Sequence, residues 1–217
     1  MVHGNIIASS LSIKDLGITF QVNLSFDEHI CKITSMANSR LGIIKNLFQV
    51  ICKEEFLILY KAYARPILEF GVTVWSPFLR KHEIAIEKVQ KRATRLVRGF
   101  GNMSYPQRLK ELRLPTLFYR RRRCDMIQVF RIIKDIDNID SEVFFELNTS
   151  ITRKNHIFKL NKPRGLTSQK LHCFSHRVVN DWNGLPKSVG ELDSVNSFKS
   201  VLEDYWRKVD FKYNYKF

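Results

Sequence analysis

The stretch His82–Arg98, HEIAIEKVQKRATRLVR, shows the pattern that organises this chain. Its apolar residues recur three and four apart, and at about 100° per residue they share one arc of a helix. The opposite arc carries cations, with no acid between Lys88 and Arg98. The stretch therefore predicts a helix that packs one face inward and presents the other to a partner. The apolar arc is Ile86, Val89, Ala93, Leu96 and Val97, and the cationic arc is Lys88, Lys91, Arg92, Arg95 and Arg98.

Apolar stripes of the same period lie on both sides of this helix. The segment 57–75 repeats the pattern around Pro66, which has no N–H to donate and should kink the helix. Upstream, residues 11–24 alternate apolar and polar around Gly17, and Ser25 with Glu28 matches a capping box. We expect a mainly α fold, a helical bundle with a small N-terminal β element and a helical C-terminal region after a long loop. The predicted helices span 27–50, 57–75, 82–98, 105–112, 116–135, 171–183 and 194–208.

The same pattern suggests four segments. Residues 1–26 hold the short strands, and 27–135 form a helical domain that carries the basic face. Residues 136–170 form an irregular connection, with a short strand expected at His156–Leu160, and 171–217 form the C-terminal helical region. The tail 210–217 alternates aromatic and polar residues, and we interpret it as a frayed terminus, the alternative being a base-stacking segment.

Charge limits the kinds of partner. The 217 residues hold 36 Lys+Arg against 21 Asp+Glu, a net charge of +15, of which +12 lies in residues 80–134. Such an excess favours nucleic acid or an anionic membrane face as the partner. No apolar stretch is long enough for a membrane span, and the N-terminus lacks the pattern of a secretory signal. We expect a nuclear or cytoplasmic protein, not secreted, with reduced cysteines and no membrane partner.

Four consecutive arginines, Arg120–Arg123, raise a question of orientation. In a helix they span about 300°, so they cannot all face water. We expect Arg120 and Arg121 to point outward toward nucleic acid. Arg122 falls on the buried side, where a guanidinium needs a partner. Asp125, Glu111 or a bound phosphate could provide it.

No catalytic motif is present in the sequence. There is no Gly-rich phosphate loop, no HExxH and no GxSxG. Adjacent acids of the kind that hold two metal ions are nearly absent, and Glu54-Glu55 reads as ordinary charge at a helix start. We therefore expect no catalytic residues, no metal site and no cofactor for this chain.

Several blocks resemble, in the same order, a stretch of non-LTR retrotransposon polyproteins of the jockey and CR1 type. In those proteins the stretch lies downstream of the catalytic core of the reverse transcriptase. The resemblance covers about residues 14–202. Its main blocks are LGI at 16–18, LSF at 24–26, YKAYARPILEFG at 60–71, VWSP at 74–77, IEKVQKRATR at 86–95, YPQRL at 105–109 and FSHRVVNDWNGLP at 174–186.

The resemblance implies a role for each segment. Residues 1–26 would be a remnant of the end of the polymerase palm, and 27–135 would be the thumb-like region that holds the template–primer duplex. The partner would then be an RNA–DNA hybrid or another duplex, gripped by shape and phosphates. The predicted nucleic-acid-binding residues are Lys88, Lys91, Arg92, Arg95, Arg98, Arg120 and Arg121.

The resemblance stops short of the polymerase active site. That site needs a Tyr/Phe-x-Asp-Asp turn and a further Asp to hold two Mg²⁺ ions, and this sequence has no Asp-Asp pair. Mg²⁺ is thus implied only for the full-length family enzyme, and this chain alone should bind without catalysis. Two alternatives remain open. One is a helical protein-interaction module with no nucleic-acid role, and the other is a polymerase completed by another chain.

Overall fold

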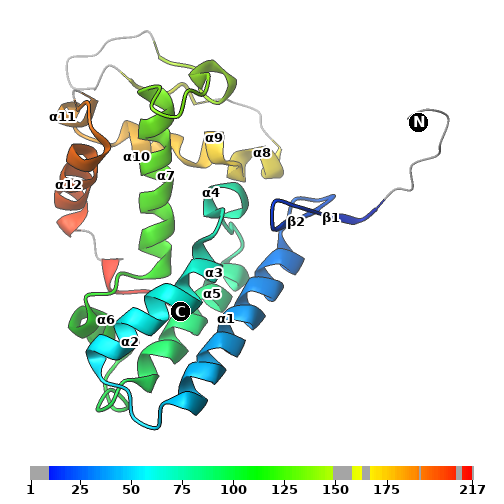
Figure 1. The fold of residues 1–217 in the computed structure, drawn as a ribbon. Coiled ribbons are helices and arrows are strands. Elements are labelled where there is room, and N and C mark those ends of the chain that lie inside the picture. Colours follow the sequence, from blue (N-terminus) through cyan, green and yellow to red (C-terminus); the bar gives the residue numbers. More distant parts are fainter. Residues whose placement is uncertain (1–9, 149–157, 163–166, 191, 209–211, 217) are drawn as a thin grey trace.

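The computed structural model describes residues 10–148, 158–162, 167–190, 192–208 and 212–216, and it confirms the mainly α fold with a small N-terminal β element (Figure 1). The strands are β1 (Ser12–Asp15) and β2 (Ile18–Gln21). The helices are α1 (Asp27–Leu47), α2 (Lys53–Leu59), α3 (Arg65–Glu69), α4 (Val72–Trp75), α5 (Arg80–Ala93), α6 (Tyr105–Leu112), α7 (Leu117–Ile133), α8 (Ser168–His172), α9 (Phe174–Arg177), α10 (Val179–Asn183), α11 (Lys187–Gly190) and α12 (Val195–Tyr205). Short 3₁₀ turns occupy Thr94–Leu96, Ser141–Val143 and Trp206–Lys208.

The strands form an antiparallel hairpin in which Ser12 pairs with Gln21 and Asp15 with Ile18. Its two-residue turn has φ of 44° at Leu16 and 87° at Gly17, the positive values that a tight hairpin turn requires. Ile18 is buried in the core, and β2 lies against α1. The hairpin is therefore held by apolar packing on a helix, since two strands alone are marginal in water.

Two apolar clusters make up the core, and α7 joins them. The first lies among α1, α2, α3, α5 and α6, and the second lies where α10 and α12 pack on α7 (Figure 1). The clusters meet at the start of α7, where Leu117 belongs to the first and Tyr119 to the second. This division precedes residue 135, where the sequence pattern places a domain boundary.

The helix expected over 57–75 is interrupted twice. Residues Tyr60–Ala64 form a π-helical turn, in which the N–H of Arg65 donates to the carbonyl of Tyr60 five residues back. This widened turn precedes Pro66 and accommodates its missing donor. The chain then breaks at Gly71, which has φ of 62°.

Other local expectations were wrong. The side chain of Gln21, rather than a Ser25–Glu28 capping box, accepts from the N–H of Glu28 at 3.1 Å. The helix expected over 171–183 is divided among α8, α9 and α10. The strand expected at His156–Leu160 lies partly outside the described residues, and its described end contributes one antiparallel bridge between Leu160 and Leu147.

The C-terminal tail is packed in its described part, contrary to the expected fraying. The carbonyl of Lys212 accepts from the N–H of Thr116 at 2.8 Å. Tyr215 is 6% exposed, belongs to the first cluster and accepts at its hydroxyl from Arg80 at 2.9 Å. The tail thus returns to the junction between α5 and α7. Among the described residues no helix has the length and apolar character that crossing a membrane requires.

Candidate nucleic-acid interface

The cations predicted to lie along one side of the third helix do reach the surface. Lys88, Arg92, Arg95 and Arg98 are exposed, and Lys91 is half-buried. We call these five residues the basic face. The opposite side of α5 is buried in the first cluster, as its apolar arc predicts. The amphipathic division expected from the sequence is therefore confirmed, with the helix ending at Ala93 and the 3₁₀ turn carrying Arg95.

The four exposed cations of the basic face have no acidic partner within the described part of the chain. Lys88, Arg92, Arg95 and Arg98 form no ion pair among those residues. Burial lowers the pKa of the neighbouring Arg108, and the positive charge of Arg95 lowers it further. The surface therefore keeps a positive potential that can attract a polyanion.

A shallow pocket of about 300 Å³ adjoins the basic face. Lys91 and Arg95 line it together with Ser104 and Arg108. The buried Arg108 guanidinium donates to Thr94 Oγ1 at 3.0 Å, to the Met103 carbonyl at 2.7 Å and to the Lys91 carbonyl at 3.3 Å. Arg108 thus ties α6 to the end of α5 and holds the backbone from which Lys91 and Arg95 project.

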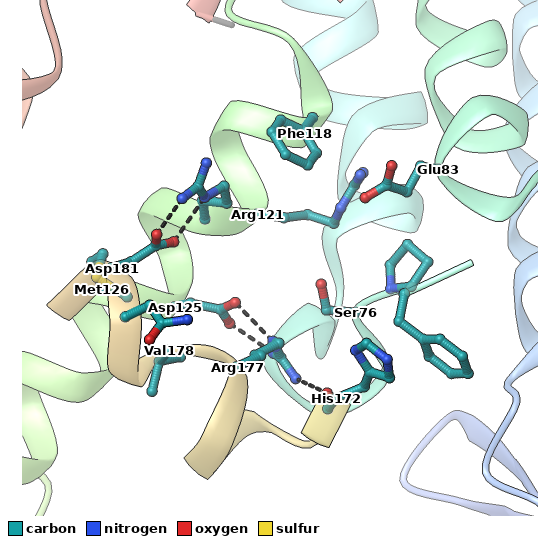
Figure 2. Close-up of a pocket in the computed structure, with 14 residues that line it drawn as sticks. Ser76, Glu83, Phe118, Arg121, Asp125, Met126, His172, Arg177, Val178 and Asp181 are labelled. Carbon is teal, nitrogen blue, oxygen red and sulfur yellow. Dashed lines mark hydrogen bonds and ion pairs between the residues drawn. The ribbon is translucent and has the colours of Figure 1, made fainter. Parts of the chain in front are cut away.

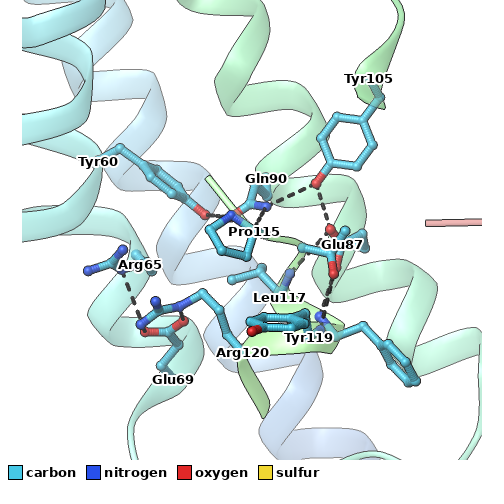
Figure 3. Close-up of polar contacts among 12 residues, drawn as sticks. Tyr60, Arg65, Glu69, Glu87, Gln90, Tyr105, Pro115, Leu117, Tyr119 and Arg120 are labelled. Atoms are coloured by element: carbon cyan, nitrogen blue, oxygen red, sulfur yellow. Dashed lines mark hydrogen bonds and ion pairs between the residues drawn. The ribbon is translucent and has the colours of Figure 1, made fainter. Parts of the chain in front are cut away.

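The arginines of α7 behave differently, and the expectation that Arg120 and Arg121 face outward is wrong. Arg120 forms a two-pronged ion pair with Glu69, with Nη2 to Oε2 at 2.9 Å (Figure 3). Burial lowers the pKa of Arg120, but the hydrogen bonds to Glu69 together with the negative charge of Glu69 and other neighbours outweigh it, so the net shift is upward. Arg121 is only 4% exposed. Arg121 is buried and Arg120 is half-buried in its ion pair because α7 is covered on more sides than its apolar stripe predicts.

Arg122 is an ion-pair member, as expected, but its partner is Asp181 of α10, with Nε to Oδ2 at 2.8 Å. Asp125, one of the predicted partners, instead accepts two hydrogen bonds from Arg177 at 2.8 and 3.0 Å. The other, Glu111, pairs with Lys53 at the surface. Partners more than 50 positions away in sequence could not be read from helical spacing.

A buried polar network that the sequence analysis missed joins α5 to its neighbours (Figure 3). Tyr60 donates to Gln90 Oε1 at 2.8 Å, and Gln90 Nε2 donates to the Tyr105 hydroxyl at 3.1 Å. Tyr105 in turn donates to Glu87 Oε1 at 2.6 Å. The available signal was the spacing of Glu87 and Gln90, which places two polar side chains beside the apolar arc of an amphipathic helix.

Glu87 also binds the start of α7. Its carboxylate accepts from the N–H groups of Leu117 and Phe118, each at 3.3 Å. These are among the first N–H groups of a helix, which lack partners within the helix. Burial raises the pKa of Glu87, and the hydrogen bonds from Tyr105 and these N–H groups oppose the shift. The network fixes α5, and so the basic face, relative to the rest of the molecule.

Comparison with protein-family models, with curated proteins and with solved structures finds no match to this chain. In the ranges that the structure describes, no group of three or more His, Cys, Asp or Glu side chains is placed to hold a metal ion. The geometry of the basic face and its supporting network is therefore the main basis for a functional assignment.

Proposed function

We propose that this chain binds nucleic-acid duplexes through its basic face and has no catalytic activity on its own. The single observation that carries the proposal is the row of exposed cations on α5 and the turn that follows it, namely Lys88, Arg92, Arg95 and Arg98, which form no ion pair in the described residues. Lys88, Arg92 and Arg95 stand at i, i+4 and i+7, so they cover about 10 Å along the helix axis at 1.5 Å per residue. Long cationic side chains on a rigid rod suit contacts to successive phosphates.

The sequence resemblance supports a duplex as the ligand. Residues 27–135 resemble the thumb-like region of jockey and CR1 type reverse transcriptases, which holds an RNA–DNA hybrid. Proteins recognise A-form duplexes through shape and backbone contacts more than through base edges. The exposed row consists of one lysine and three arginines, side chains that commonly contact phosphate oxygens.

Two other readings make different predictions. A helical protein-interaction module would be favoured by acids lying over the basic face, and in the described residues no acid forms an ion pair with Lys88, Arg92, Arg95 or Arg98. A polymerase completed by another chain would extend a primer. Primer extension with the purified protein and Mg²⁺ tests this, and template-dependent synthesis by the chain alone would contradict the non-catalytic assignment.

Salt dependence of duplex binding is the direct test of the basic face. Four neutralised phosphates predict a slope of log K against log salt of about −3.6 for a B-form duplex, at about 0.9 per phosphate. Replacing Lys88, Arg92, Arg95 and Arg98 together with alanine should remove most of that slope and weaken binding alike on all sequences.

A control variant removes the same charge elsewhere. Lys32, Arg40 and Lys45 on α1 and Lys61 in the π-helical turn are exposed cations outside the basic face, and replacing all four with alanine should leave most of the slope intact. Equal losses in both variants would show that net charge alone drives binding. An unchanged slope in the first variant would contradict the assignment of the basic face.

A further inference from the structure

A second pocket, of about 280 Å³, lies where α4, α7 and the α8–α10 segment meet (Figure 2). Three arginines line it, namely Arg121, Arg122 and Arg177. The acids Glu83, Asp125 and Asp181 line it as well. This pocket has its own set of lining residues, none of which belongs to the basic face.

Two of these arginines are fully engaged by protein groups. Arg122 is paired with Asp181 through both carboxylate oxygens. Arg177 donates to both oxygens of Asp125, to the Thr73 carbonyl at 2.7 Å and to the His172 carbonyl at 3.3 Å. Each pair cancels its own charge, so neither guanidinium is left over for a ligand.

Arg121 is the exception. Arg121 is only 4% exposed, and its side chain extends across the pocket toward Glu83 (Figure 2). Neither Nη1 nor Nη2 has a hydrogen-bond partner among the described residues. Buried donors are almost always satisfied in folded proteins, because an unsatisfied one loses its hydration without compensation.

The two acids whose charges act most strongly on Arg121, Glu87 and Glu83, accept hydrogen bonds from other donors, Glu83 through Oε2 only. Glu83 accepts from Arg80 at 3.3 Å and from the Tyr215 hydroxyl at 3.5 Å. Glu87 accepts from Tyr105 and from two backbone N–H groups of α7. Burial lowers the pKa of Arg121, and the charges of Glu87 and Glu83 act against that shift. A guanidinium remains charged at neutral pH, so Arg121 presents to the pocket a positive charge and two terminal nitrogens without hydrogen-bond partners among the described residues.

We propose that this pocket binds the carboxylate of a small organic ligand, with Arg121 as the residue that recognises it. Two terminal nitrogens of one guanidinium match the two oxygens of one carboxylate. A single unpaired cation beside Glu83 suits one negative charge better than two, which favours a carboxylate over a phosphate dianion.

The walls of the pocket indicate what the rest of the ligand is like. Phe78 lies parallel to His172, with ring centroids 4.4 Å apart and an interplanar angle of 7°. Phe118, Met126 and Val178 add apolar surface. A volume of about 280 Å³ lies just below the range of about 300–1,000 Å³ typical of ligand pockets. The ligand therefore has a compact apolar or aromatic body attached to its carboxylate.

Benzoate and 3-phenylpropionate are suitable probes, with inorganic phosphate as the comparison. We would titrate each into the full chain labelled with ¹⁵N and follow the backbone amides of residues 76, 78, 121–126 and 172–180 together with the arginine Nε–H signals. Saturable shifts that include the Arg121 side-chain signal are expected with the carboxylates. Absence of saturable binding by both carboxylates, or tighter binding of phosphate, would overturn the proposal.

Variants test the role of the guanidinium. Arg121→Met should weaken carboxylate binding by at least about tenfold, the loss expected for hydrogen bonds to a charged group. Arg95→Met, which removes a cation from the basic face instead, should change it by less than about twofold. Equal affinities in wild type and Arg121→Met would overturn the proposal.

Two further measurements keep the test decisive. If Arg121→Met does not fold, Arg121→Lys can replace it, because lysine keeps the positive charge but lacks the paired N–H donors of a guanidinium. The Arg121 side-chain signal of the wild-type protein also reports ligand contact without any substitution. Duplex binding by the variants separates this proposal from the basic face. Arg95→Met should reduce its salt slope, whereas Arg121→Met should leave the slope unchanged.

Discussion

Replacing Glu87 with alanine tests whether the buried network holds α5 against α7. The Glu87 side chain is 0% exposed and accepts from the Tyr105 hydroxyl and from the N–H groups of Leu117 and Phe118. Alanine leaves these three donors without their acceptor in the interior. It also removes the negative charge that raises the pKa of the buried Arg121 most. We expect a large loss of stability with the helical content retained.

The magnitude follows from the three donors. Each buried donor left unsatisfied costs about 1–3 kcal/mol. Relief of the desolvation of the carboxylate and entry of water offset part of the sum, so we expect a loss of about 3 kcal/mol in the free energy of unfolding. For a protein of this size that loss lowers the melting temperature by about 6–12 °C.

Urea denaturation followed by circular dichroism measures the effect, with thermal melting as a second readout. The matched control is Glu111→Ala, which removes a glutamate of α6 whose partner Lys53 also lies near the surface. Exposed ion pairs contribute little to stability, so the control should change it far less. If Glu87→Ala costs no more than the control, the network does not hold the two helices together.

Three further predictions concern stability. Burial raises the pKa of Glu87 above its ordinary value of 4.5, so the stability that Glu87 contributes is fully present below its unfolded-state pKa and is lost as the pH rises through its folded-state pKa. The stability difference between wild type and Glu87→Ala, measured by urea titration, should therefore be largest at or below about pH 4.5 and shrink above it. A difference that grows with pH would contradict this. Gly71→Ala should cost at least about 1–2 kcal/mol in the same assay, because Gly71 has φ of 62° and a Cβ there would lie 2.7 Å from Ile18 Cδ1. Gly42→Ala should instead stabilise the protein by about 0.5–1 kcal/mol, because a Cβ at Gly42 would have no atom within 4 Å. Stability changes of the same sign in both variants would refute the reasoning. Tyr215→Ala should cost about 2–3 kcal/mol and lower the melting temperature, because the ring packs in the first cluster, whereas a frayed tail would show no change.

Much of the local structure could be predicted from periodicity alone. The helix over 105–112 was predicted at its observed bounds, and the helix expected from residue 194 begins at Val195, with Ser194 as its cap. Where the expectations were wrong, longer-range contacts override local signals. Gln21 reaches the start of α1 from the hairpin, so the capping box at Ser25 does not form.

The two candidate sites differ in the same way, because one follows from local sequence and the other depends on long-range contacts. The basic face could be predicted because an amphipathic helix with one covered side must present its other side to water, and Arg92 and Arg95 do so. The carboxylate pocket could not, since it depends on where Arg121 points after α7 is covered on several sides. Its paired arginines find partners on helices far along the chain, as Arg122 does with Asp181.

The amino-acid sequence by itself determined the helical class, the inward stripes and the concentration of positive charge in residues 80–134, because these follow from the period of the residues and their types. Only the tertiary structure decided which cations stay free. Burial and ion pairing depend on distances between segments remote in sequence. They place the α7 arginines Arg120 and Arg122 in ion pairs and leave Lys88, Arg92, Arg95 and Arg98 in solvent.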